Sequence, residues 1–141
     1  MLDKIFSSKI AYYLDLIRFY NPIGFMLLMW PSWFALALLP NKNIDLIYWY
    51  LLFLIGSVLM RSAGCIINDL IDIDIDNKIK RTAFRPLTSR KISIKESIFF
   101  LLFLLFLILI ILYQFNIKSI LIGLFSFLFI LLYPLMKRYT H

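Results

Sequence analysis

Half of the acidic residues in this 141-residue chain lie in one short segment, residues 69–76. If one helix runs through the segment at about 100° per residue, Asp69, Asp72 and Asp76 share a face and Asp74 points away. Three carboxylates this close repel one another near a low-dielectric medium, so they need a neutralising cation. Hard oxygen ligands suit Mg²⁺ or Ca²⁺, and Mg²⁺ in particular combines one or two carboxylates with phosphate oxygens. We predict a metal site at these three aspartates; the structural alternative is a solvated acidic helix end.

Basic residues follow the acidic segment directly. They are Lys78, Lys80, Arg81, Arg85, Arg90 and Lys91. Lysine and arginine form charge-assisted hydrogen bonds with phosphate, and arginine can do so with two parallel bonds. Membrane topology alone would also place cations here, so each residue has two explanations. Acid and base together predict a site for a metal-bound anion such as a polyisoprenoid diphosphate, with its hydrocarbon tail among the helices.

The elements that must carry this site are membrane helices. The chain is 62% hydrophobic, 18% aromatic and only 16% charged, which is far more apolar than a soluble domain of this size. Four stretches approach the length of about 17 to 20 apolar residues that a spanning helix needs. They are residues 22–39, 46–67, 97–113 and 119–136. We therefore predict an all-α polytopic membrane helix bundle of about four transmembrane helices, preceded by a surface helix over residues 1–20.

The distribution of positive charge predicts the orientation. All lysines and arginines except Lys42 and Lys118 fall on one side of four spans, including those of the loop 68–95. The positive-inside rule makes that side cytoplasmic, with both termini there, and we expect location in the cytoplasmic (inner) membrane. The net charge of +7 is then a topology signal, and we expect no nucleic-acid partner.

Arg61 is a further candidate, on the second predicted span. It lies eight residues before Asp69, roughly 12 Å deeper along a regular helix and on nearly the same face. A buried arginine needs a partner. It either binds substrate or pairs with a neighbouring carbonyl or carboxylate. Gly24 and Gly64 are expected to let helices approach one another closely.

The acidic segment and the loop after it resemble a known family. The segment NDLIDIDID (68–76), followed by KRT (80–82) and RPL (85–87), resembles the first acidic motif of the UbiA family of intramembrane prenyltransferases. The 4-hydroxybenzoate polyprenyltransferase branch is most similar. Its first helix resembles RFYNPIGFMLLMWPSWFALAL (18–38), its second LMRSAGCIINDL (59–70), and the end of its fourth YPLMKRYTH (133–141).

The resemblance implies a reaction. A polyprenyl group is transferred from polyprenyl diphosphate to the ring of an aromatic acid, 4-hydroxybenzoate, as a step of ubiquinone biosynthesis. It implies that Mg²⁺ on Asp69, Asp72 and Asp76 binds the diphosphate and stabilises its charge as it leaves. Further residues are expected to orient the metal shell (Asn68), to hold the diphosphate (Lys80, Arg81 and Arg85) and to place the acid's carboxylate (Arg138).

The family pattern also contains helices and a second aspartate-rich motif that residues 1–141 lack. We therefore expect the chain to be one partial UbiA-type domain, the amino-terminal half, and inactive alone unless a second polypeptide supplies the rest. The competing hypothesis is a non-catalytic four-helix membrane protein that binds divalent metal or anionic lipid.

Overall fold

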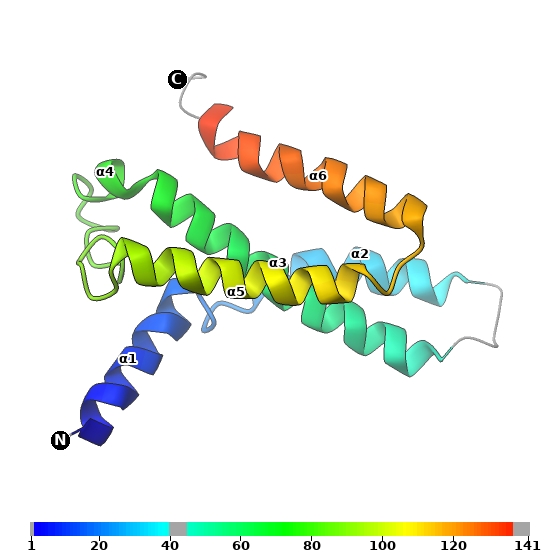
Figure 1. The fold of residues 1–141 in the computed structure, drawn as a ribbon, viewed down its shortest axis with the longest axis horizontal. Coiled ribbons are helices and arrows are strands. Elements are labelled where there is room, and N and C mark those ends of the chain that lie inside the picture. Colours follow the sequence, from blue (N-terminus) through cyan, green and yellow to red (C-terminus); the bar gives the residue numbers. More distant parts are fainter. Residues whose placement is uncertain (1, 40–44, 137–141) are drawn as a thin grey trace.

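The fold, given by a computed structural model that describes residues 2–39 and 45–136, is built from helices (Figure 1). Within these ranges there are six helices and no strand. They are α1 (Leu2–Leu16), α2 (Ile23–Ala37), α3 (Leu46–Ile71), α4 (Ile73–Asp76), α5 (Ile94–Leu112) and α6 (Ile117–Met136). The predicted all-α class is confirmed, and α2, α3, α5 and α6 fall on the four expected spans.

Helix α3 is the centre of the arrangement. It packs against α2 and α5 most extensively and also contacts α1, α4 and α6. With 26 residues it is about 39 Å long, enough to cross a bilayer. Among the described helices, α3 and α5 have the length and apolar composition of a membrane span, while α2 and the stretch Ile117–Phe129 are apolar but shorter. Figure 1 shows α1, α4 and the carboxyl end of α6 at the same end of the bundle, which we call the loop end.

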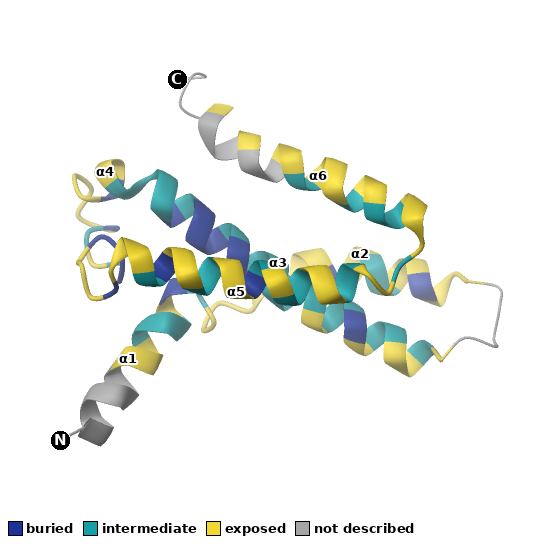
Figure 2. Cartoon of the chain, viewed as in Figure 1, coloured by how far each residue is buried: buried dark blue, intermediate teal, exposed yellow. Residues whose placement is uncertain are grey.

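Burial is concentrated at the loop end (Figure 2). The carboxyl-terminal half of α3 contains most of its buried residues, including polar Ser62 and Asp69. By contrast, α5 and α6 expose large apolar side chains such as Phe99, Phe125 and Leu128. Such side chains suit an apolar environment, which a membrane provides. Protein packing therefore serves mainly to hold the loop end together.

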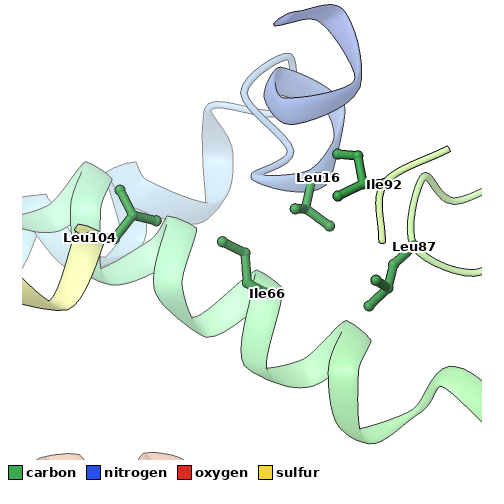
Figure 3. Close-up of a cluster of buried hydrophobic side chains, with 5 residues drawn as sticks. All are labelled: Leu16, Ile66, Leu87, Ile92 and Leu104. Atoms are coloured by element: carbon green, nitrogen blue, oxygen red, sulfur yellow. The ribbon is translucent and has the colours of Figure 1, made fainter. Parts of the chain in front are cut away.

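One hydrophobic cluster fixes the loop against the helices (Figure 3). Its buried members come from α1 (Leu16), α3 (Ile66), the loop after α4 (Leu87 and Ile92) and α5 (Leu104). Leu16 and Ile66 are completely inaccessible to solvent. Each such side chain contributes about 1.5–3 kcal/mol by leaving water. The cluster therefore holds residues 77–93 in one place although they contain little regular structure.

Local hydrogen bonds determine where α5 begins. Ser93 Oγ accepts from the Glu96 backbone N–H at 3.2 Å, and Glu96 Oε2 accepts from the Ser93 N–H at 2.9 Å. This reciprocal capping box satisfies two backbone donors that a helix start leaves unpaired. Lys9 Nζ also donates to Glu96 Oε1 at 2.9 Å, which ties α1 to the same turn. This bond raises the pKa of Lys9 above its usual 10.5.

The acidic segment departs from prediction, because α3 does not continue through Asp76. It ends at Ile71, and Asp72 has φ −91° and ψ 7°, outside regular helical geometry. Only the single turn α4 follows. A continuous helix would carry Asp76 about 10 Å beyond Asp69, whereas the bend returns Asp76 to the same cationic side chain. The prediction of three aspartates on one face of one helix is therefore wrong.

Candidate functional site

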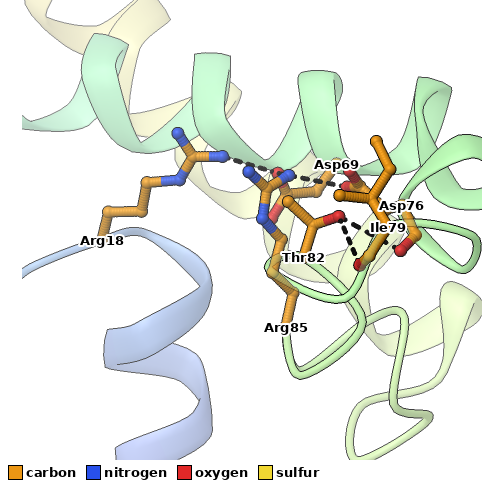
Figure 4. A network of polar contacts seen from close by, with 6 residues as sticks. All are labelled: Arg18, Asp69, Asp76, Ile79, Thr82 and Arg85. Atoms are coloured by element: carbon orange, nitrogen blue, oxygen red, sulfur yellow. Dashed lines mark hydrogen bonds and ion pairs between the residues drawn. The ribbon is translucent and has the colours of Figure 1, made fainter.

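Four charged side chains form a network at the loop end (Figure 4). Arg85 Nη1 donates to both Asp69 Oδ1, at 3.0 Å, and Asp76 Oδ2, at 2.6 Å. Arg18 Nη2 also donates to Asp69 Oδ1, at 2.8 Å. The aspartate side chains are only 3% and 8% exposed, and the arginines 27% and 30%. We call these four residues, Arg18, Asp69, Asp76 and Arg85, the ion network.

Each member of the network comes from a different element. Asp69 lies in the last turn of α3, Asp76 ends α4, and Arg85 lies in the loop before α5. The buried Thr82 hydroxyl is shared between two carbonyl acceptors, the Asp76 oxygen at 3.1 Å and the Ile79 oxygen at 3.3 Å. These contacts fold the loop back on α4. The bend after Ile71 and this local turn together bring the two carboxylates to one guanidinium group.

Arg18 reaches the network from the turn between α1 and α2. Its φ of 55° is in the left-handed region, which costs a non-glycine residue free energy. The Phe19 N–H bonds back to the Leu14 carbonyl at 2.9 Å, closing the end of α1 around this conformation. Sequence reasoning missed Arg18. The available signal was that it is the first residue of the RFYNPIG stretch (18–24), directly before the first span.

The charges of the ion network balance, with two carboxylates and two guanidinium groups. Ionised groups lose hydration when they are buried, so each must regain its hydrogen bonds from the protein. Here Arg85 supplies a bond to each carboxylate, and Arg18 supplies a second bond to Asp69. Removing one arginine would leave a buried negative charge without full compensation.

The other predicted site residues lie around this network. Asn68 and Asp72 are half-buried, and Asp72 occupies the bend between α3 and α4. Lys80 and Arg81 are exposed on the loop. Arg138 lies outside the described residues. The structure thus brings Asp69, Asp76 and Arg85 together; in the ranges that it describes, no three acidic, histidine or cysteine side chains are grouped as a metal site.

Arg61 lies deeper on α3, and its surroundings bear on its two predicted roles. The residue is half-buried, and in the described part of the chain it makes no hydrogen bond or ion pair. The predicted pairing with a neighbouring carbonyl or carboxylate is therefore not seen there. Its guanidinium instead lies against Gly24 of α2, because a Cβ atom built on Gly24 would overlap it. Arg18, Arg61 and Arg85 all lie within electrostatic range of the buried Cys65 thiol.

The glycines on α2 and α3 behave differently from one another. A Cβ atom on Gly64 would have no atom within 4 Å, so this glycine does not mediate close helix packing. The prediction for Gly64 is wrong. Gly24 does mediate a close approach, but to a charged side chain.

The donor set of the site suits a hard cation. Asp69 and Asp76 each place an oxygen within 3.0 Å of the same Arg85 nitrogen, so the two carboxylates are close neighbours. A pair of carboxylates matches the protein share of a Mg²⁺ site, in which phosphate oxygens and water complete the coordination. In the structure the Arg85 guanidinium group bonds both carboxylates. The chemistry of the oxygen donors therefore fits a metal, and the arginines beside them fit a phosphate.

Comparison with known proteins assigns the family. A sequence profile of the UbiA prenyltransferase family matches residues 28–141. The chain therefore belongs to the UbiA prenyltransferase family, whose members are membrane-integral and generally depend on a divalent metal. The resemblance found in the acidic segment is confirmed.

Individual relatives point to one branch. The chain is 38% identical over 139 residues to the 4-hydroxybenzoate octaprenyltransferase of Pseudoalteromonas translucida, covering 99% of this chain and 47% of the relative. It is 44% identical over 130 residues to the mitochondrial 4-hydroxybenzoate polyprenyltransferase of Caenorhabditis elegans, covering 92% and 36%. The octaprenyltransferase of Albidiferax ferrireducens is 41% identical, with 95% and 45% covered.

The chain spans a little under half the length of the two bacterial relatives and 36% of the Caenorhabditis elegans one. No solved structure matches it.

Proposed function

We propose that this chain takes part in the transfer of a polyprenyl group from polyprenyl diphosphate to the ring of 4-hydroxybenzoate, in ubiquinone biosynthesis. The observation that carries the proposal is the convergence of Asp69 and Asp76 on Arg85 at the loop end. Membership of a prenyltransferase family and the activities for which the relatives are named support it.

The site residues have distinct proposed roles. Asp69 and Asp76, with Asp72 from the bend, would hold Mg²⁺, which when bound neutralises diphosphate oxygens. Arg85, whose guanidinium bonds both carboxylates, would bind the diphosphate beside them. Exposed Lys80 and Arg81 add charge-assisted bonds to the same group. Asn68 orients the metal shell, and Arg138 binds the aromatic carboxylate.

Arg61 is proposed to bind an oxyanion of a substrate. Its guanidinium lacks a protein partner in the described ranges, and it lies on the helix that carries Asp69. A cation in an apolar segment without a partner is costly, and a bound anion would offset that cost. Orientation follows the charge distribution: we propose the inner membrane, with the loop end and both termini cytoplasmic.

Prenyl transfer in isolated membranes tests the proposal. The chain is expressed with polyprenyl diphosphate, labelled 4-hydroxybenzoate and Mg²⁺, first alone and then together with the carboxyl-terminal half of the Pseudoalteromonas relative. Labelled prenyl product that disappears in Asp69→Asn and Asp76→Asn is the expected result. Asp74→Asn is the matched control, because Asp74 is an exposed carboxylate of the same segment.

Comparing the chain alone with the chain plus the carboxyl-terminal half tests whether a second polypeptide is required. Product only with the second half supports the prediction that a second polypeptide completes the enzyme. Robust product from the chain alone contradicts the inactive state predicted for it. Absence of product in both arrangements, with the proteins folded in the membrane, contradicts the prenyl-transfer proposal and favours the binding-protein hypothesis.

A further inference from the structure

Gly24 is set apart from the other glycines by what its side chain would meet. An ideal Cβ atom at Gly24 lies 2.8 Å from Arg61 Cζ and 3.0 Å from Nη2, and closer still to Nε. Added Cβ atoms on Gly56 and Gly123 would meet only methyl groups, at 3.9 and 3.3 Å, and one on Gly64 would meet nothing. The space that Gly24 leaves is therefore filled by a guanidinium group.

The location of this contact links it to the ion network. Gly24 lies in the first turn of α2, six residues after Arg18, and α2 packs along α3. Arg61 extends from α3 toward this turn and is half-buried there. With no hydrogen bond or ion pair to hold it among the described residues, its position depends on packing. Because Gly24 has no side chain, the guanidinium can pack against the α2 backbone there.

We propose that Gly24 is a positioning residue, which leaves the space that holds the Arg61 guanidinium where it binds a substrate oxyanion. The inference rests on the proposed role of Arg61. The oxyanion is a carboxylate or a diphosphate, since arginine binds both with paired N–H groups. Any larger residue at position 24 pushes the guanidinium away from that place.

Because an added Cβ at Gly24 would overlap a flexible side chain, Gly24→Ala is expected to affect binding but not stability. The atoms that an added Cβ would meet are at the end of a long, flexible side chain, so Arg61 can move while the α2 and α3 backbones stay in place. Gly24→Ala should then cost little stability and still displace the guanidinium. Alanine also has the higher helix propensity, which offsets part of any strain. A glycine needed only for helix packing would show the opposite, a loss of stability.

The test compares four variants of the full chain purified in detergent: Gly24→Ala, Arg61→Ala, the double variant, and Gly64→Ala as matched control. Titration calorimetry measures affinity for 4-hydroxybenzoate and, separately, for inorganic pyrophosphate with Mg²⁺. Gly24→Ala is expected to weaken one of these about tenfold or more, as Arg61→Ala does. The double variant should bind no more weakly than Arg61→Ala, because both changes act through one side chain. Gly64→Ala should bind normally, and the melting temperature of Gly24→Ala should stay close to the wild-type value.

The ligand affected identifies the oxyanion: 4-hydroxybenzoate means a carboxylate, and pyrophosphate means a diphosphate. Normal binding by Gly24→Ala overturns the inference, as does a double variant whose losses add. The NMR signal of the Arg61 Nε–Hε group tests positioning without any ligand, and it should shift in Gly24→Ala and not in Gly64→Ala. If wild-type protein binds neither probe, the role of Arg61 fails, and an unchanged signal in Gly24→Ala then overturns the positioning role as well.

Discussion

The two ends of α3 differ in their side-chain contacts: ion pairs at one end and aromatic contacts at the other. At the loop end, Asp69 is buried in a network with two arginines. At the opposite end, Trp33 donates its indole N–H to the Tyr50 carbonyl at 3.1 Å, and their rings pack edge to face with centroids 5.3 Å apart. Amphipathic aromatic residues are typical of the membrane interface, where one edge meets water and the rest hydrocarbon. One end therefore has the composition of a membrane interface, and the other buries paired charges.

The two ends of α3 also differ in the hollow beside them. A hollow of about 410 Å³ lies at the aromatic end, lined by Trp30, Trp33, Phe34, Ala37 and Tyr50. None of these residues is charged, so the hollow can take hydrocarbon but cannot neutralise a diphosphate. At the loop end the guanidinium groups of Arg18 and Arg85 lie directly on the carboxylates. The charged end is therefore the one whose side chains suit the proposed chemistry, although this hollow lies at the other end.

The largest loss of stability is expected from Arg85→Ala, at the loop end. It leaves the buried Asp76 carboxylate without its guanidinium partner and Asp69 with Arg18 alone. Breaking a buried ion pair from one side costs about 3–5 kcal/mol in the free energy of unfolding. Thermal unfolding in detergent measures it, with Lys78→Ala as control for an exposed cation of the same loop. Equal stability of the two variants would mean that the network does not hold the loop.

The next largest effect is expected from Leu16→Ala. This side chain is fully buried in the cluster that joins α1 to the loop, and its truncation leaves a cavity. The free energy of unfolding should fall by about 2–4 kcal/mol. Leu121→Ala is the control, because Leu121 is an exposed apolar residue on α6. If both variants lose the same stability, the loop end is not better packed than the lipid-facing surface.

Trp33→Phe should have a smaller effect at the aromatic end. Phenylalanine keeps an aromatic ring against Tyr50 but cannot donate to its carbonyl oxygen. The loss should be about 1 kcal/mol, the net value of one hydrogen bond. Chemical denaturation followed by circular dichroism measures it against Trp30→Phe, whose indole makes no hydrogen bond among the described residues. A loss as large as that of Arg85→Ala would remove the distinction between the two ends.

The smallest effect is expected from Lys9→Met, at the exposed pair between α1 and α5. Its side chains are 55% and 38% exposed, so solvent screens the interaction. Because the bond raises the pKa of Lys9, its contribution is complete below pH 10.5 and is lost as pH rises through the raised value. Melting temperatures of the variant and the wild type should therefore nearly coincide at pH 7 and converge fully at higher pH. A difference that grows with pH contradicts this assignment.

The helices could be predicted because their signal is local. An apolar run of about 18 residues predicts a span whatever the rest of the fold does, and α2, α3, α5 and α6 follow those runs. The bend at Asp72 could not be predicted this way. It depends on Arg85 lying where it can bond both Asp69 and Asp76, which is a tertiary condition.

The candidate site was predicted in part for the same reason. Asp69, Asp76 and Arg85 belong to one segment, and their types and spacing already suggested a shared role. Arg18 is 51 residues from Asp69 in sequence, and only the packing of α1 on α3 brings them together. The Gly24 and Arg61 contact likewise joins two helices, so the glycine alone suggested packing but not its partner.

Binding of Mn²⁺ to the purified chain, followed by the electron paramagnetic resonance signal of the free ion, tests the Asp69 and Asp76 site most directly. Mn²⁺ serves as a hard-cation probe for Mg²⁺. A diphosphate binds Mn²⁺ by itself, so the reference is the same mixture without protein. We predict that, with a polyprenyl diphosphate present, the wild-type chain lowers the free-ion signal below this reference, and that Asp69→Asn and Asp76→Asn abolish this further fall while Asp74→Asn preserves it. Undiminished diphosphate-dependent Mn²⁺ binding in the variant that lacks both Asp69 and Asp76 carboxylates would contradict the proposed site.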